Sequence, residues 1–236
     1  MKLRDRREIL GFIVPAVIVL VITAGIRMGW ARSNDTKRGS DLLKVDMQRG
    51  EVLFPAVVQP GAMDRPLGVK GHHAVVFKEG RAATWALFRS EVSDLDVRRA
   101  LEKLGAKAGE NLTVESWTAR KDMTRRDADL VVDGTPIEAF VAWGGKRVPL
   151  ESLITEAQSP SATLDLRYGG NERFRETFRS GCIICLYSCP GGAIGNRAYT
   201  IRDYVRDGVI FHAQQNQLPR AGTRVQMILK PKLEVE

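Results

Sequence analysis

Three cysteines near the C-terminal end of the chain have the spacing of metal ligands. Cys182, Cys185 and Cys189 lie within eight residues, and Pro190 follows directly. Bacterial ferredoxins hold a [4Fe–4S] cluster with the run C-x2-C-x2-C-x3-C-P. The last three cysteines and the proline of that run are present here, while Arg179 stands where the first cysteine would be. The spacing therefore predicts an iron–sulfur site that lacks one thiolate.

Several interpretations of these cysteines stay open. A fourth ligand is available in His212, in an acidic side chain such as Asp203, in solvent or in a partner subunit, and a [3Fe–4S] cluster needs only three thiolates. Zinc bound by the three cysteines and His212 is the alternative metal site. A disulfide with one spare thiol is expected if the segment faces an oxidising compartment. Inert buried thiols are the remaining alternative.

Other chemistries of these cysteines are disfavoured. Leu186 follows Cys185, whereas covalent attachment of a c-type haem requires a histidine there. A thiol oxidoreductase that uses Cys182 and Cys185 needs a thioredoxin-like βαβ context, which the flanking residues do not indicate. The sequence also lacks a P-loop, a G-x-G-x-x-G run and a recognisable serine–histidine–aspartate arrangement. We therefore expect no catalytic residues.

The residue types around the cysteines suit a cluster. Glycines let backbone N–H groups approach sulfur, and apolar side chains give a dry wall; these residues are Gly181, Gly191, Gly192, Ile183, Ile184 and Leu186. We expect Arg179 to bias the local field. Eight arginines between positions 170 and 224 either surround an anionic cluster or form ordinary ion pairs at the surface, and we favour the ion pairs.

Two further metal-ligating side chains, His72 and His73, are adjacent at the edge of a predicted strand. Neighbouring side chains of a strand point to opposite faces of the sheet. We therefore predict that these histidines do not chelate one metal and have a structural or surface role.

The N-terminus predicts a membrane anchor within residues 1–30. Ile9 to Ile26 is an 18-residue run without a charged side chain, long enough for a helix to cross a bilayer core of about 30 Å. Basic residues precede the run, so the positive-inside rule places the N-terminus in the cytoplasm and the following domain in the periplasm. Arg6 and Arg7 resemble a twin-arginine export signal, a route that carries folded proteins loaded with cofactors.

The net charge of +8 divides between two parts of the chain. Residues 1–32 hold six basic and two acidic side chains, and residues 33–236 hold 30 basic and 26 acidic ones. Half of the excess therefore belongs to the membrane-entry segment. The remainder is too small to predict binding to nucleic acid.

The patterning behind the anchor predicts an α+β, strand-rich globular domain. Residues 31–41 are polar and are predicted to form a linker, followed by a domain over 42–168 and a cysteine segment with C-terminal strands over 169–236. Alternating apolar residues predict strands over 42–60, 74–77, 82–88, 113–117, 135–143, 147–150, 163–168, 209–212 and 223–229. We expect hairpin turns at Arg49-Gly50 within the first of these ranges, at Glu79-Gly80 between 74–77 and 82–88, and at Gly144-Gly145. Ser93 is expected to cap a helix that ends at Gly105, and 199–205 to form a short helix.

Four runs carry a resemblance to a known family: VLFPAVVQPG, GHHAVVF, SDLDVRRALEKLGAKAG and WGGKRVPLESLI. Together they resemble the YdjY-type domain over about residues 45–155, and the similarity extends to the cysteine segment. The resemblance implies an extracytoplasmic domain, and some members of the family are described as ferredoxin-like. The matching residues are mostly turn and packing residues, so the resemblance implies a fold more than a chemistry.

Taken together, the sequence predicts a single-pass protein of the inner membrane with a periplasmic iron–sulfur centre that relays electrons. We expect its partners to be subunits of a membrane redox complex, such as a cytochrome or another redox protein, and the lipid around residues 9–26. The alternative is a non-redox structural or assembly subunit of an envelope complex whose cysteine loop is held by a disulfide.

Overall fold

The computed structural model describes residues 39–63, 71–125, 129–156, 161–203, 205 and 209–233. All of them belong to one compact unit, Lys37–Glu236. The predicted membrane anchor, with its twin-arginine-like signal, and most of the predicted linker lie outside the described residues. Within those described ranges, every helix is too short or too polar to cross a bilayer.

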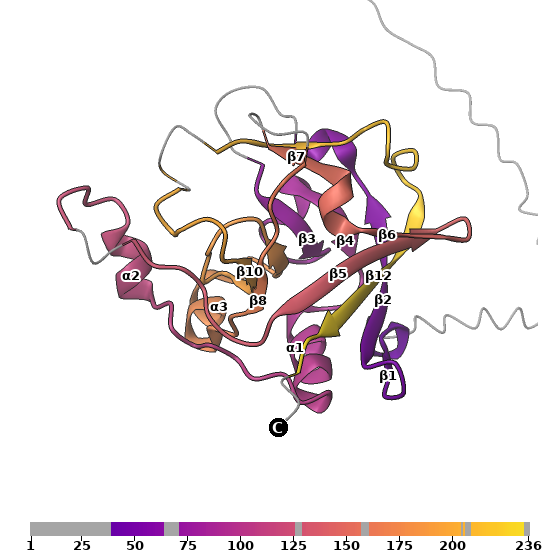
Figure 1. Cartoon of the computed structure of the whole chain (residues 1–236), viewed down its shortest axis with the longest axis horizontal. Helices are drawn as coiled ribbons and strands as arrows, with labels where there is room; N and C mark the ends of the chain where they lie inside the picture. Colours follow the sequence, from indigo (N-terminus) through magenta and orange to yellow (C-terminus); the bar gives the residue numbers. More distant parts are fainter. Residues whose placement is uncertain are drawn as a thin grey trace, which may run out of the picture. The chain divides into compact units, whose positions relative to one another are not determined.

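A ten-stranded mixed sheet dominates the domain (Figure 1), in the order β6-β5-β12-β2-β4-β3-β9-β10-β8, with β1 beside β2. The strands are β1 (Lys44–Asp46), β2 (Glu51–Val58), β3 (His73–Phe77), β4 (Ala86–Ser90), β5 (Ile137–Trp143), β6 (Lys146–Pro149), β8 (Leu166–Tyr168), β9 (Cys182–Cys185), β10 (Gly192–Asn196) and β12 (Arg224–Pro231). A separate pair consists of β7 (Ile154–Glu156) and β11 (Phe211–Ala213). The prediction of a strand-rich domain with few helices is confirmed.

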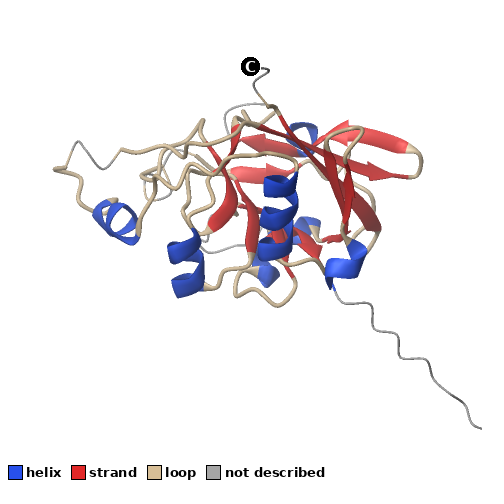
Figure 2. Cartoon of the chain, turned by 90° about the horizontal axis from the view of Figure 1, so that it is seen from below, coloured by secondary structure: helices blue, strands red, loops and turns tan. Residues whose placement is uncertain are grey.

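The helices are short, and Figure 2 shows that they lie outside the sheet. They are α1 (Asp94–Lys103), α2 (Val114–Ala119) and α3 (Glu172–Phe178), with 3-10 turns η1 (Gly39–Leu42), η2 (Pro60–Ala62), η3 (Ala83–Trp85) and η5 (Leu150–Leu153). Ser93 caps α1 as predicted, because its hydroxyl accepts a hydrogen bond from the backbone N–H of Asp96. Buried Val97 and Leu101 place one face of α1 in the main core.

The pairing of β2 with β12 explains why apolar residues alternate along β2. Residues of β2 are alternately buried and half-buried, and Phe54 lies opposite Met227 of β12. The inward side chains join the core that also holds the cysteines. The hairpins predicted around Arg49-Gly50 and Gly144-Gly145 are confirmed as β1–β2 and β5–β6. Both glycines of the second turn have positive φ, as a tight hairpin turn requires.

Three sequence-based predictions of secondary structure are wrong. Residues 82–88 do not form an antiparallel hairpin with residues 74–77. The 3-10 turn η3 lies between the two strands, and β4 then runs parallel to β3. The strand predicted over 113–117 is instead α2, whose first turn is closed by a reciprocal capping box between Thr113 and Ser116. The described part of the helix predicted over 199–205, residues 199–203, forms turns.

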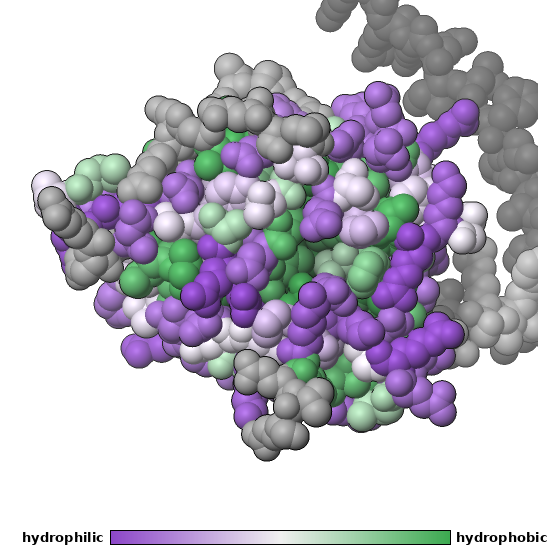
Figure 3. Space-filling model, viewed as in Figure 1, coloured by the Kyte–Doolittle hydropathy of each residue, from purple (hydrophilic) through white to green (hydrophobic). Residues whose placement is uncertain are grey.

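The surface of the domain is mixed in character. In Figure 3 hydrophilic side chains surround smaller apolar patches on the visible face. The large exposed apolar side chains of the described residues come from separate segments: Met47, Met123, Phe178, Val205, Ile210 and Leu233. Scattered exposure of this kind is ordinary for a folded domain.

Candidate metal centre

The three cysteines lie together in the interior of the domain. Cys182 and Cys185 are the first and last residues of β9, and Cys189 lies in the loop that connects β9 to β10. The exposed fractions are 1% for Cys182, 0% for Cys185 and 7% for Cys189. All three are free thiols in this structure. Two of the donors therefore sit on a central strand, with β3 on one side and β10 on the other.

Irregular pairing between β3 and β9 brings the donors to one place. Val76 pairs with Cys182, Val75 with Ile184 and His73 with Cys185, so the register shifts twice within four residues. In a regular strand, residues three apart point to opposite faces of the sheet. A bulge adds a residue and changes that alternation. On a regular strand, the side chains of Cys182 and Cys185 would point to opposite faces of the sheet. The two register shifts between β3 and β9 explain how these side chains can nevertheless approach each other.

The thiols form a short chain of interactions. Cys185 affects the pKa of both Cys182 and Cys189, and both of them affect the pKa of Cys185. Burial raises the pKa of Cys185 well above its usual value, with a contribution from its hydrogen bond to Cys182. The pKa of Cys189 is also raised well above its usual value, first by its hydrogen bond to Cys185 and then by burial.

The pKa of Cys182 is also raised. The hydrogen bond from Cys185 lowers it, but burial and the nearby Cys189 and Asp94 together outweigh that effect. Thiols with raised pKa values are poor nucleophiles, which disfavours a thiol oxidoreductase. A metal ion or cluster would have to displace the protons on binding.

Both histidines that precede the cysteines in the sequence also reach this site. Nδ1 of His73 lies 3.3 Å from Sγ of Cys182. The donor atoms of His72, His73 and Cys185 all lie within 4.8 Å of one another, and the two imidazole rings are 3.9 Å apart between centroids. The prediction that adjacent histidines must diverge is wrong here, because β3 begins only at His73 and is irregular there.

The protonation of His73 suits a ligand. Burial, followed by the charge of His72, lowers the pKa of His73 well below its usual value. The ring is therefore neutral at pH 7, with a lone pair on one nitrogen. His72 is itself 8% exposed, and its backbone oxygen accepts a hydrogen bond from Leu186 in the cysteine segment.

The other predicted ligands lie elsewhere. His212 is exposed on β11, which pairs with β7 rather than with the main sheet. The Asp203 carboxylate accepts hydrogen bonds from the backbone and hydroxyl of Thr200. Arg179 is exposed at the end of α3, with a left-handed backbone, and lines a surface depression of about 600 Å³ with Arg175 and Glu79.

Three of the eight arginines of this region form ion pairs of the kind that we favoured. Arg197 pairs with Asp133 at 3.0 Å, and Arg224 pairs with Glu91 at 2.7 Å. Arg175 lies 3.5 Å from the Asp94 carboxylate. Asp94, the partner of Arg175, is also close enough to Cys182 to raise the pKa of that thiol.

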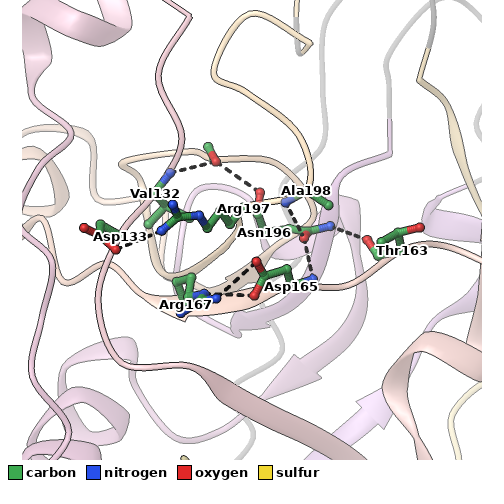
Figure 4. A network of polar contacts seen from close by, with 9 residues as sticks. Val132, Asp133, Thr163, Asp165, Arg167, Asn196, Arg197 and Ala198 are labelled. Carbon is green, nitrogen blue, oxygen red and sulfur yellow. Dashed lines mark hydrogen bonds and ion pairs between the residues drawn. The ribbon is translucent and has the colours of Figure 1, made fainter.

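A buried polar network holds the loop behind the cysteines (Figure 4). Asn196 accepts hydrogen bonds from the backbone N–H groups of Asp165 and Ala198 and donates to the carbonyls of Thr163 and Leu186. The side chain of Asn196 therefore ties the end of β10 to two other segments, one of which directly follows Cys185.

Backbone groups around the loop also approach sulfur, as we predicted from the glycines of this segment. The Gly191 N–H lies 3.4 Å from Sγ of Cys189 and donates to it. The Ser180 hydroxyl donates to the carbonyl of Gly191 and accepts from the backbone N–H of Cys182. Ile183, Ile184 and Leu186 are fully buried, as a dry wall requires.

The donor set fits a thiophilic metal. Around one tetrahedral ion, sulfur and nitrogen ligands lie about 3.5 Å apart, given bonds of about 2.3 Å and 2.05 Å. The His73–Cys182 distance of 3.3 Å is close to that value. A four-iron cluster separates its ligand sulfurs more widely than a single ion does. Iron–sulfur and zinc chemistry both accept these donor types.

Comparison with known proteins places the chain in a family context. The sequence profile of the YdjY domain family matches residues 43–230. The chain is 29% identical over 161 residues to the Uncharacterized protein YdjY of Escherichia coli (strain K12), covering 67% of this chain and 66% of that relative. The chain thus spans about two thirds of the length of that relative. No solved structure matches the chain.

Proposed function

The chain belongs to the YdjY domain family, as its four sequence runs predicted, and from this premise we propose that it is an electron-transfer subunit of a membrane redox complex. In this proposal Cys182, Cys185 and Cys189 are thiolate ligands of an iron–sulfur centre. The observation that carries it is the convergence of three buried thiols that are spaced as in a ferredoxin.

The proposed chemistry is the transfer of one electron without bond formation. A reduced partner delivers the electron to the centre, and an oxidised partner removes it. Ile183, Ile184 and Leu186 exclude water, which helps to set the potential of a cluster. Cys189, the most exposed of the three thiols, marks where the centre comes nearest to the surface.

The proposed location is the periplasmic face of the inner membrane. Residues 9–26 have the length and composition of a membrane-spanning helix, and the basic residues before them favour a cytoplasmic N-terminus. The twin-arginine-like pair would permit export after the centre is assembled.

Metal analysis of the full-length protein tests this proposal. The protein is purified in detergent under anaerobic conditions, and iron, acid-labile sulfide and zinc are measured per chain. We expect iron and sulfide in comparable amounts. A preparation with neither iron nor sulfide, from cells that load other iron–sulfur proteins, would contradict the proposal.

A structural zinc site is the second candidate, and the compactness of the donors favours it. Sγ of Cys182 lies 3.3 Å from Nδ1 of His73, a separation that suits two ligands of a single tetrahedral ion. The protein would then be a non-redox subunit of an envelope complex. One zinc per chain, without sulfide, is the result that selects this candidate. A Cys182–Cys185 or Cys185–Cys189 disulfide, seen by non-reducing mass spectrometry, would exclude both metals.

A further inference from the structure

The cysteine motif lacks the first of the four ferredoxin cysteines, because Arg179 occupies that position. Arg179 is also exposed, at the end of α3. A fourth donor must therefore come from another segment of the chain, from solvent or from a partner. Among the described residues, His72 and His73 form a group with Cys185 in which the donor atoms lie within 4.8 Å of one another.

We propose that His73 supplies the fourth ligand through Nδ1, so that the centre has three thiolates and one imidazole. This inference rests on the metal site of the proposed function and holds for iron or zinc. Its basis is the 3.3 Å distance between His73 Nδ1 and Cys182 Sγ, inside a buried site that Cys185 shares.

The fold fixes this imidazole where a ligand is needed. His73 begins β3, and its backbone pairs with Cys185 on one side and with Ala86 on the other. The ring of His72 packs against the ring of His73 and lies 5.9 Å from the ring of Tyr187 between centroids. The donor atom of His72 belongs to the same group, but the 3.3 Å approach to Cys182 is made by His73. In this proposal His73 is therefore the ligand, and His72 positions its ring.

The proposal differs from a zinc or cluster site completed by His212. His212 is exposed and lies on the separate β7–β11 pair. It offers a matched control because it is a histidine of the same chain, in a strand, outside the group of donor atoms.

Cobalt substitution tests the ligand set directly. The full-length protein is freed of metal, titrated with Co²⁺ under anaerobic conditions and compared with His73→Ala, His73→Cys and His212→Ala. Thiolate-to-cobalt absorption grows with the number of thiolate ligands. We expect His73→Cys to increase it by about one third, from three thiolates to four. We expect His73→Ala to weaken Co²⁺ binding by at least about tenfold, and His212→Ala to match the wild type.

The outcomes separate this inference from the proposed function. Wild-type protein that is purified without iron or zinc and also binds no Co²⁺ would contradict both. Wild-type binding with an unchanged spectrum and affinity in His73→Ala and His73→Cys would overturn the histidine ligand and leave the cysteine site standing. If His73→Ala fails to fold, as judged by circular dichroism, the rise in charge-transfer absorption in His73→Cys decides the question alone.

Discussion

At the scale of residues, the chemistry of the site was half visible in the sequence. The spacing of the cysteines indicated a common site, and the structure brings all three thiols together. The sequence predicts that the two histidines do not share a metal, because adjacent side chains of a regular strand point to opposite faces. That rule fails at His72 and His73, where the strand is just beginning and its register shifts. A bulge leaves no clear mark in a single sequence, so this error could not be avoided.

The amide of Asn196 gives a stability prediction. Asn196 is fully buried and makes four side-chain hydrogen bonds to backbone groups. Asn196→Ala leaves those groups unpaired, so we expect it to lower the free energy of unfolding by about 3 kcal/mol. Urea unfolding measures the change. Asn216→Ala, at an exposed position, is the control and should cost less than about 0.5 kcal/mol. Equal losses in both variants would refute the role assigned to Asn196.

Tyr199 gives a prediction about pH. Burial, followed by its hydrogen bond to Glu156, raises the pKa of Tyr199 to about 12, above the value of about 10 in an unfolded chain. The folded state therefore keeps its proton longer, and the free energy of unfolding falls as pH rises from about 10 to about 12. Urea unfolding at pH 8 and pH 11 should show a smaller decline in Tyr199→Phe than in the wild type. Identical declines would contradict this assignment.

At the scale of elements, prediction succeeded where local signals agree with the sheet. The cap at Ser93 and the paired glycines at 144–145 each specify a conformation by themselves, and both are observed. Prediction failed where tertiary contacts decide. The parallel pairing of β3 and β4 depends on η3, and β9 is recognisable as a strand only between its neighbours β3 and β10. Helix α3 was missed, because a seven-residue segment carries little periodicity.

The turn before β9 offers a test of how this element is positioned. Gly181 has φ +69°, and a Cβ there would lie 2.6 Å from Cα of Gly80. Gly181→Ala therefore combines backbone strain with a clash between two backbone segments. We expect a loss of about 3 kcal/mol or more in the free energy of unfolding, with reduced metal content. Chemical denaturation and metal analysis of the same preparation measure both effects.

Gly222→Ala is the matched control for that variant. Gly222 has φ +84°, but no atom lies within 4 Å of the added Cβ. It should cost only about 1 kcal/mol, the strain of the left-handed backbone. A Gly181→Ala protein no less stable than Gly222→Ala would show that the contact with Gly80 does not matter.

At the scale of the whole molecule, the fold of the domain and its predicted location depend on different parts of the chain. The sheet unites the two predicted parts of the domain, since β9, β10 and β12 belong to the same sheet as β2–β5. The composition of residues 1–32 places half of the net positive charge in the segment of the predicted anchor. The predicted location thus depends on a segment that lies outside the described residues.

Membrane fractionation tests that segment. We expect the full-length protein to remain with membranes during carbonate extraction, because the predicted 18-residue apolar helix would be embedded in lipid. A version that begins at residue 31 should be recovered without detergent and with unchanged metal content. Release of the full-length protein by carbonate would contradict the anchor and leave the metal site untouched.

The measurement that bears most directly on the central claim is the absorption spectrum of anaerobic full-length protein before and after dithionite. The account predicts a broad absorption of sulfur-to-iron charge transfer that bleaches on reduction and returns on reoxidation. It also predicts that Cys185→Ser, which removes the most buried of the three thiols, abolishes that absorption. A colourless wild-type protein, or a spectrum that dithionite leaves unchanged, would contradict a redox centre at Cys182, Cys185 and Cys189.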